Sequence, residues 1–238
     1  MSKNKHMNYS SKPTGNSTKP LVIITLTVIV LLIALFIFSN MASNKNQPST
    51  VFQEPPSLVN QPVLGNDDAP VTLIEFGDYK CPSCKAWSNV VYPQLQKEYI
   101  DTGKLKFAYI NVLFHEQESV LAALAGEAVF AQDLQAFWMF HKALYEAQPQ
   151  ANHDGLWITE EKILEVVKTA APTIDLTKLK EDLKNQEVAS RVKIDNELVQ
   201  KFGVKQTPTV MINGTVLENP FDINMIKELI DKEIGDKQ

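Results

Sequence analysis

The chain has 238 residues and a formal net charge of −5, from 23 basic and 28 acidic side chains. All of the acidic residues follow residue 50, so the later part of the chain is more acidic than the whole. Because phosphate binding needs a basic face, this distribution argues against nucleic acid as a partner.

The first segment, residues 1–20, is polar and contains four lysines and no acidic residue. Residues 21–38 are a run of 18 residues without a charge, proline or glycine. A helix of that length would measure roughly 27 Å, close to the bilayer hydrocarbon core of about 30 Å. The preceding lysines predict a cytoplasmic N-terminus and an extracytoplasmic remainder. We expect a single-pass signal anchor in the cell membrane rather than a cleaved signal peptide, because residues 39–42 fit a cleavage site poorly.

Residues 39–62 are rich in Asn, Gln, Ser and Pro and lack periodicity, which is typical of a flexible tether. A strand that extends the domain is the alternative for Ser57–Leu64. The remaining residues, 63–238, suit one domain of ordinary size.

The order of elements in this domain predicts its fold. A buried strand at 71–76 leads into a Cys-Pro-Ser-Cys motif, an amphipathic helix to about residue 100, kinked at Pro93, and a second strand at 104–112. A helical block follows: 118–147, a helix capped by Thr159, another capped by Asp175, and 187–202 closed by Gly203. Strands at 207–212 and 215–218 flank an Asn-Gly turn, and a helix at 221–234 ends the chain. We therefore expect an α/β thioredoxin-like fold with a helical insertion at about 116–186.

The two cysteines, Cys81 and Cys84, point to redox chemistry. A disulfide between them would close almost no loop and add little stability, and a structural zinc site needs about four ligands. Cys81 is expected at the N-cap of a helix, where unpaired N–H groups and the helix dipole stabilise a thiolate. Cys81 is thus the expected nucleophile, and Cys84, one turn further in, the resolving thiol.

Two further features belong with the cysteines. Glu75 is an acid within the apolar strand before the motif, and could exchange a proton with Cys84; the alternative is that it faces solvent at the strand end. Thr207-Pro208 begins a strand, where proline is badly placed. A cis bond beside the active site would resolve this conflict and free Thr207 to pair with a substrate, whereas the alternative is an ordinary edge proline.

Three segments in order resemble the DsbA-like family of thiol–disulfide oxidoreductases, especially its membrane-anchored Gram-positive members of the BdbD type: EFGDYKCPSC (75–84), FWMFH (137–141) and GVKQTPT (203–209). The resemblance implies that Cys81 is the nucleophile, Cys84 the resolving thiol, Glu75 the buried acid and Pro208 cis, with Pro82, Ser83, Thr207 and Pro208 next to the substrate. Ser83 departs from the His of the enterobacterial members, which suggests a milder oxidant.

The resemblance also implies partners: unfolded secreted proteins with free thiols, and a quinone-linked membrane reoxidant of the DsbB/BdbC type. We expect a monomeric dithiol oxidase with no cofactor beyond its own disulfide. The alternatives are a disulfide reductase or isomerase, and a tethered peptide-binding chaperone with an incidental Cys pair. Asp67-Asp68 and Asp195-Asn196-Glu197 could contribute to a structural calcium site, although neither has the spacing of a calcium-binding loop.

Overall fold

The computed structural model describes residues 28–35 and 50–236, which belong to two separate compact units. In the N-terminal unit, residues 28–35 are helical and their apolar side chains are exposed. Within the described ranges, no helix has the length and apolar character needed to cross a bilayer. The predicted basic segment 1–20, most of the predicted span 21–38, and tether residues 39–49 lie outside the described residues.

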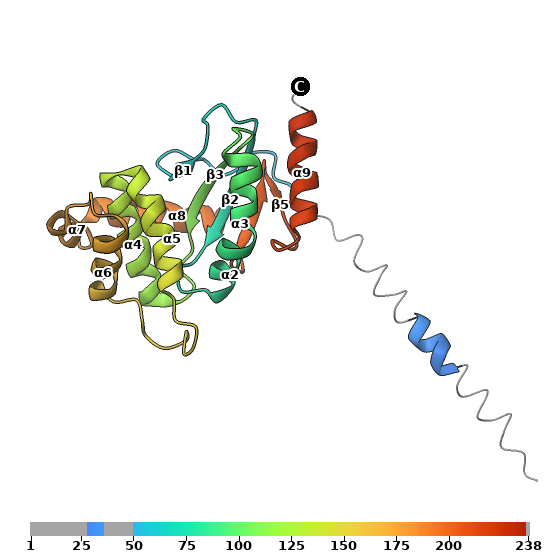
Figure 1. Ribbon diagram of the computed structural model, residues 1–238, viewed down its shortest axis with the longest axis horizontal. Coiled ribbons are helices and arrows are strands. Elements are labelled where there is room, and N and C mark those ends of the chain that lie inside the picture. Colours follow the sequence, from blue (N-terminus) through green and yellow to red (C-terminus); the bar gives the residue numbers. More distant parts are fainter. Residues whose placement is uncertain (1–27, 36–49, 237–238) are drawn as a thin grey trace, which may run out of the picture. The chain divides into compact units, whose positions relative to one another are not determined.

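The second unit is built on a five-stranded sheet in the order β1-β3-β2-β4-β5 (Figure 1). The neighbours β2 and β3 run parallel, and the remaining pairs are antiparallel. The strands are β1 (Val63–Leu64), β2 (Val71–Gly77), β3 (Leu105–Asn111), β4 (Thr209–Ile212) and β5 (Thr215–Val216). This arrangement confirms the expected parallel βαβ unit and the C-terminal hairpin.

The helices of the second unit cover the sheet and build the insertion (Figure 1). They are α2 (Pro82–Val90), α3 (Tyr92–Leu95), a π-helical turn (Gln96–Ile100), α4 (Glu116–Gln132), α5 (Leu134–Ala147), α6 (Glu160–Ala170), α7 (Leu176–Asp182), α8 (Gln186–Lys201) and α9 (Ile223–Gly235). The predicted break near Pro93 is confirmed, because α2 ends at Val90 and α3 begins at Tyr92.

The expected helical stretch 118–147 is confirmed, but it consists of two helices, α4 and α5. Asp133 interrupts it with an extended backbone (φ −160°, ψ 117°), and its side chain accepts hydrogen bonds from the N–H groups of Gln135 and Ala136. It therefore acts as the N-cap of α5. The sequence did not reveal this break, because the helical spacing of apolar residues resumes immediately after the capping residue.

Three apolar clusters hold the fold together. One lies between the sheet and α2, α3 and α9, and includes Trp87, whose indole N–H donates to the Pro220 carbonyl at 2.8 Å. The opposite face of the sheet packs against the end of α8 through Val199 and Phe202. The third cluster fills the insertion and reaches Cys81 and Cys84. The redox motif thus lies where the sheet-based half meets the insertion.

Residues 50–62 are part of the folded domain, so the predicted tether 39–62 is too long. The Thr50 carbonyl accepts from Val216 N–H at 2.8 Å, and Phe52 N–H donates to the Gly214 carbonyl at 2.9 Å. The Phe52 ring then packs edge-on against Phe202, with centroids 4.8 Å apart. The segment reaches the opposite edge of the sheet as β1. Phe202, Gly214 and Val216 follow their partners in this segment by 150–166 positions, so its polar composition did not reveal them.

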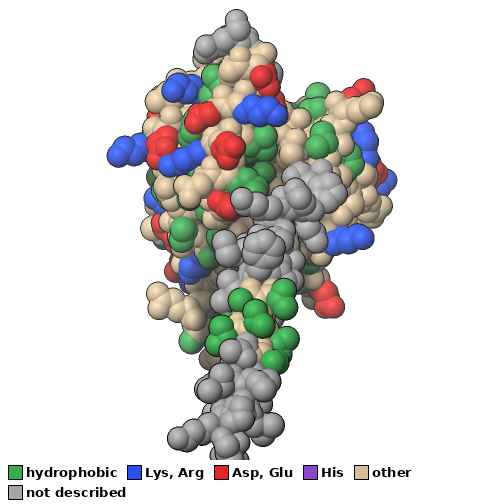
Figure 2. Space-filling model, turned by 90° about the vertical axis from the view of Figure 1, so that its right-hand side faces the viewer, with side chains coloured by type: hydrophobic (Ala, Val, Ile, Leu, Met, Phe, Trp, Pro, Cys, Tyr) green, Lys and Arg blue, Asp and Glu red, His purple; other side chains and the backbone are tan. Residues whose placement is uncertain are grey.

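One face of the domain is mixed in charge. On the face seen in Figure 2, acidic and basic side chains are interspersed rather than gathered in one basic area.

Candidate active site

The cysteines lie at the carboxyl end of β2, where the chain turns through residues 78–80 into α2. Cys81 is the N-cap of α2 with an extended backbone (φ −73°, ψ 121°), and Pro82 occupies the first helical turn. Proline is favourable there because its missing N–H would have no helical partner. Both sulfurs are free thiols; Cys81 is 8% exposed and Cys84 fully buried. The helix start therefore presents Cys81, and not Cys84, to an incoming thiol.

The surroundings of Cys81 favour its thiolate. A hydrogen bond from the Cys84 thiol, with weaker ones from Thr207 and the N–H groups of Ser83 and Cys84, outweighs burial and lowers the pKa of Cys81 to about 5. Most of these donors belong to the first turn of α2, whose N–H groups have no partner within the helix. Cys81 is therefore ionised at neutral pH.

Cys84 has the opposite character. Burial, its hydrogen bond to the Cys81 sulfur and the nearby Glu75 raise the pKa of Cys84 well above its ordinary value. The Asp78 N–H donates to the Cys84 sulfur at 3.5 Å and opposes this rise only in part. The two thiols of one motif thus differ: one is an anion and the other holds its proton.

Glu75 is fully buried in β2, between Tyr109 of β3 and Val210 of β4 in the sheet register. Within the described part of the chain, neither carboxyl oxygen has a hydrogen-bond partner. Burial, and secondarily the Cys81 charge, raise the pKa of Glu75 well above its ordinary value. The alternative that it faces solvent is excluded, and the buried carboxyl group lies close enough to Cys84 to affect the pKa of that thiol.

The Thr207–Pro208 bond is cis and adjoins the motif. The Cys81 sulfur lies 3.5 Å from the Thr207 carbonyl oxygen, to which the thiol donates when it is protonated. Pro208 is buried, whereas Pro82 and Ser83 are exposed on the same rim. β4 begins only at Thr209, so the proline does not interrupt the sheet ladder. The structure thus brings together Cys81, Cys84, Glu75, Thr207 and Pro208, which are up to 133 positions apart in the sequence.

Sequence reasoning missed Asp78, which shapes the turn before Cys81. Its carboxylate accepts from Lys80 N–H at 2.9 Å and Phe114 N–H at 3.1 Å, from the Ser119 hydroxyl at 2.8 and 2.9 Å, and it pairs with His115 Nδ1 at 2.8 Å. Asp78 therefore ties the turn to the beginning of α4. An Asp followed two residues later by an N–H partner is a common turn signal, but the bonds to α4 could not be read from the sequence.

A buried aromatic cluster lies behind the sulfurs and was also missed. The Tyr79 hydroxyl and His141 Nδ1 are 2.9 Å apart, and the hydroxyls of Tyr109 and Tyr145 are 2.9 Å apart. Burial lowers the pKa of His141 to about 3, so the ring is neutral at physiological pH. This agrees with a packed helix residue rather than a catalyst.

The acids considered for calcium do not form one cluster. Asp67 and Asp68 are exposed, whereas Asp195 is buried and accepts from Gln61 Nε2 and Asn111 Nδ2, each at 2.7 Å. Glu127 is buried beside Asp195 and accepts from Asn111 Nδ2 at 3.2 Å. In the described ranges, no group of three or more His, Cys, Asp or Glu residues is arranged for a metal ion.

One hollow lies away from the sulfurs. A groove of about 860 Å³ runs between α2–α3 and α5, and neither cysteine lines it. A smaller hollow of about 250 Å³ adjoins Pro82, between the turn, α4 and the loop that joins α5 to α6.

Several known proteins are similar to this chain. A family model described as thioredoxin matches residues 57–232. Disulfide bond formation protein D of Bacillus subtilis is 45% identical over 182 residues, covering 76% of this chain and 81% of that protein. The chain belongs to this thioredoxin-like family of disulfide bond formation proteins.

Other relatives agree. A probable disulfide bond formation protein D of Bacillus anthracis is 38% identical over 221 residues, covering 93% of this chain and 98% of that protein. The crystal structure of oxidised BdbD from Bacillus subtilis superposes with a TM-score of 0.74 at 43% identity, over 79% of this chain and all of that one. The expected thioredoxin-like fold with its helical insertion, and the DsbA-like resemblance, are confirmed.

Proposed function

We propose that this protein is an extracytoplasmic dithiol oxidase, which transfers the Cys81–Cys84 disulfide to exported proteins. It is a thiol–disulfide oxidoreductase, as its family membership and paired cysteines indicate. The direction of transfer rests on one observation, the pKa of about 5 at Cys81. A stable thiolate lowers the free energy of the reduced form, so the oxidised form gives up its disulfide readily.

The first step joins client and enzyme. A client thiolate attacks the Cys81 sulfur of the oxidised enzyme, the Cys81–Cys84 bond breaks, and its electron pair goes to Cys84. Burial raises the pKa of Glu75 and so favours its protonated form, which is placed to give a proton to the Cys84 thiolate, whose own pKa is also raised. The product is a mixed disulfide between the client and Cys81.

The second step releases the client. A second client thiol loses its proton and attacks the client sulfur of the mixed disulfide, and Cys81 leaves as a thiolate. Its low pKa makes Cys81 a good leaving group. The client loses two electrons and forms one disulfide, and the enzyme gains those two electrons as a reduced Cys pair.

Client binding is assigned to the rim around Cys81. The Thr207 carbonyl is positioned to accept a backbone N–H of an extended client segment, and exposed Pro82 and Ser83 adjoin the reacting sulfur. Clients of this kind are unfolded secreted chains with free thiols, since a folded protein rarely offers an extended segment around a cysteine.

The enzyme also needs a redox partner to restore its disulfide. We propose a quinone-linked membrane protein of the DsbB/BdbC type, and attachment of this protein to the membrane as a monomer through residues 21–38. Support for attachment comes from the length and apolar character of that run in the sequence. The Cys81–Cys84 disulfide is proposed as the only redox group.

A structural calcium ion is proposed beside Asp195, in place of the wider set of acids considered from the sequence. Three buried oxygens there, of Gln61, Asn111 and Glu127, have no hydrogen-bond partner within the described residues. Carboxylate and amide oxygens are calcium's usual ligands, and the ion would offset the repulsion between Glu127 and Asp195. Calcium should raise the melting temperature and a chelator should lower it; no response in either direction would exclude the ion.

The oxidase proposal is tested by mixing the oxidised protein with a reduced, unfolded ribonuclease and following both thiol loss and recovered activity. We expect stoichiometric oxidation of client thiols and none with Cys81→Ala. A peptide-binding chaperone would keep its effect on refolding in that variant. A reduction potential near the thioredoxin value of about −270 mV would instead indicate a reductase.

A further inference from the structure

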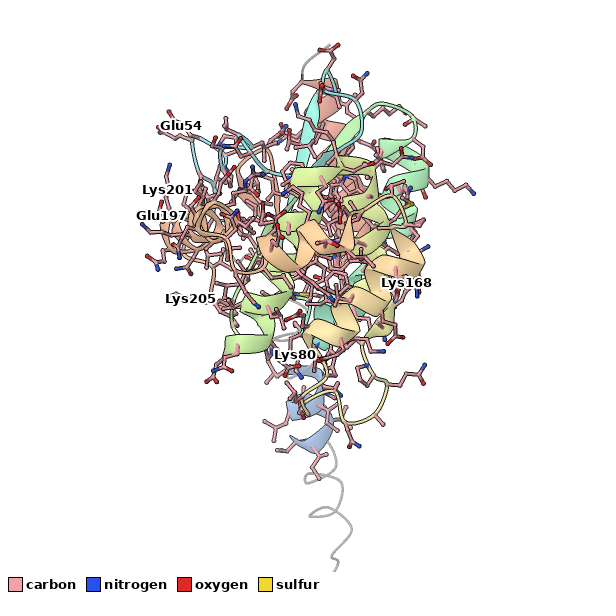
Figure 3. The ribbon with its side chains drawn as sticks, turned by 90° about the vertical axis from the view of Figure 1, so that its left-hand side faces the viewer. Glu54, Lys80, Lys168, Glu197, Lys201 and Lys205 are labelled. Atoms are coloured by element: carbon pink, nitrogen blue, oxygen red, sulfur yellow. The ribbon has the colours of Figure 1, made fainter. Side chains whose placement is uncertain are left out.

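Lys80, immediately before the reactive cysteine, is an unusual buried lysine with only 4% of its surface exposed. Its ammonium group forms an ion pair with Glu118 Oε1 at 2.6 Å and donates to the carbonyl of Gly155. It also lies 5.9 Å from the centroid of the Trp157 ring. Burying a lysine is costly unless its charge is paired, so this arrangement calls for a role. In Figure 3 Lys80 lies at the lower end of the domain.

Glu118 extends the contact from α4 to the α5–α6 loop, residues 148–159. Its second oxygen, Oε2, accepts from the N–H groups of Trp157 and Ile158, both at 2.8 Å. Despite partial burial, the bonds from Lys80 and these two N–H groups lower the pKa of Glu118. One carboxylate thus holds both the lysine and the far end of the loop.

The near end of the same loop is fixed to the redox motif as well. Gln148 Nε2 donates to the carbonyls of Tyr79 at 3.2 Å and Lys80 at 3.0 Å. Lys85 Nζ, from the second turn of α2, donates to the Gln148 and Glu146 carbonyls. The loop is therefore attached at its start, middle and end to residues that flank or contact the Cys81 turn.

The loop so held forms one wall of the 250 Å³ hollow beside Pro82. Its lining residues are Lys80, Pro82, Phe114, His115, Glu116, Glu118, His153 and Asp154. Beside it, Leu156 on the loop is 77% exposed and Phe114 is 45% exposed. Glu116 has a positive φ of 54°, a conformation that costs a non-glycine residue energy and is frequent at functional sites.

The position of this hollow suits a client side chain. Cys81 contacts Thr207 through its sulfur, and Pro82, the residue that follows Cys81, lines the hollow. A client paired along Thr207 that reaches the sulfur would continue past Pro82 into this hollow. The Lys80 and Glu118 charges compensate each other, and no further lysine or arginine lines the hollow. The remaining acidic groups are Glu116 and Asp154, of which Asp154 lies 3.4 Å from His153 Nε2.

We propose that Lys80 and Glu118 are positioning residues that hold the α5–α6 loop as the wall of a client subsite beside Pro82, and that this subsite selects a basic client side chain flanking the reactive cysteine. This rests on the proposed oxidase function and adds its substrate preference. Neither residue takes part in thiol exchange itself, because their polar atoms bond each other and the loop rather than either sulfur.

The experiment compares two reduced dithiol peptides that differ only in having Lys or Glu next to the first cysteine. Dithiothreitol serves as a third client, which has no side chain to place in the hollow. Wild-type enzyme at pH 8, above the ordinary histidine pKa of about 6.5, should oxidise the Lys peptide several-fold faster. Lys80→Met should raise KM for the Lys peptide about tenfold, with the dithiothreitol rate and the Cys81 pKa unchanged. Glu118→Gln should do the same, and the double variant should be little worse than either, since both act through one loop.

Two controls separate positioning from loss of charge or stability. Lys178→Met removes a lysine that is ion-paired with Asp182 in α7, far along the insertion, and should leave KM unchanged. Glu116→Gln with Asp154→Asn should remove the preference for the Lys peptide while preserving dithiothreitol oxidation. The proposal is overturned if wild-type enzyme shows no preference, or if Lys80→Met slows peptide and dithiothreitol equally. Failure of dithiothreitol oxidation by the wild type would instead overturn the oxidase function.

Discussion

The sheet-based half of the domain and the helical insertion contribute to the redox site in different ways. The first supplies every atom proposed to react or to touch the client backbone: the two sulfurs at the start of α2, Glu75 in β2 and the Thr207 carbonyl before β4. The insertion supplies no sulfur, yet its residues Glu118 and Ser119 bond to Lys80 and Asp78 in the turn that precedes Cys81. The chemistry is therefore local to one half, while the shape of its surroundings depends on both.

The largest effects are expected from replacing either cysteine, because the two have different roles. Cys84→Ser should accumulate a mixed disulfide with a client that itself carries a disulfide, because the Cys81 thiolate attacks that bond and the enzyme has no second thiol to release the adduct. Cys81→Ser should form no adduct and lose activity on the order of a thousandfold or more. Non-reducing electrophoresis and mass spectrometry of the trapped species check this, and an adduct through Cys84 in the Cys81→Ser variant would contradict it.

Glu75 provides the next test, because it is a buried acid beside the sulfurs whose carboxyl oxygens have no hydrogen-bond partner in the described part of the chain. Glu75→Gln should slow formation of the mixed disulfide roughly a hundredfold and flatten its pH dependence. Since the folded-state pKa of Glu75 is raised, its stabilising contribution is lost as pH rises above the ordinary value of 4.5. The variant should therefore unfold at higher denaturant concentration at pH 8. Unchanged exchange rates across pH 5–8 would remove Glu75 from the mechanism.

The stability of the two redox forms should respond differently to pH. In the reduced protein the pKa of Cys81 is about 5 when folded and near 9.0 when unfolded, so unfolding takes up a proton between these values. Thiolate stabilisation is thus fully present above pH 9 and is lost as pH falls through 5. The unfolding free energy of the reduced form, relative to the oxidised form, should rise from pH 5 to 9. Parallel curves for the two forms would contradict the pKa difference.

A smaller effect is expected far from the sulfurs, where Phe52 fixes the first described residues of the domain onto Phe202. Phe52→Ala should lower the unfolding free energy by about 2 kcal/mol and leave thiol exchange unchanged. Val59→Ala, in the same segment but 72% exposed, is the matched control and should have little effect on stability. A loss of activity without a loss of stability would show that this segment contributes to the site.

The sequence was informative wherever a local rule applied. Cys81 as a helix N-cap, the caps at Thr159 and Asp175, and Gly203 after α8 with φ +62° all follow from residues within one or two turns. The Asn-Gly hairpin and the buried strand around Glu75 were equally local. For Pro208 the local sequence left two possibilities, a cis bond beside the motif or an ordinary edge proline, and the family resemblance favoured the first.

What the sequence could not supply were contacts between distant segments. From the sequence alone Lys80 would be taken for a surface charge, because no local signal shows that it pairs with Glu118, 38 positions later. Phe52 lies in a segment with the composition of a linker, and only the structure shows that it packs against Phe202. The same holds for the bonds between Asp78 and Ser119, and for Asp195 with Gln61. These partners lie on elements whose approach is set by tertiary packing, which has no local signature.

The central claim is that the helix start holds Cys81 as an anion, and direct titration of that thiol tests it most simply. The ultraviolet absorbance of the thiolate in the reduced protein, followed from pH 3 to pH 9 with Cys84→Ala as a second sample, should give a midpoint near 5 for the intact pair. Because the Cys84 thiol is the foremost donor to Cys81, the midpoint should move upward in that variant. A midpoint near the ordinary cysteine value of about 8.5 in the wild-type protein would contradict the account.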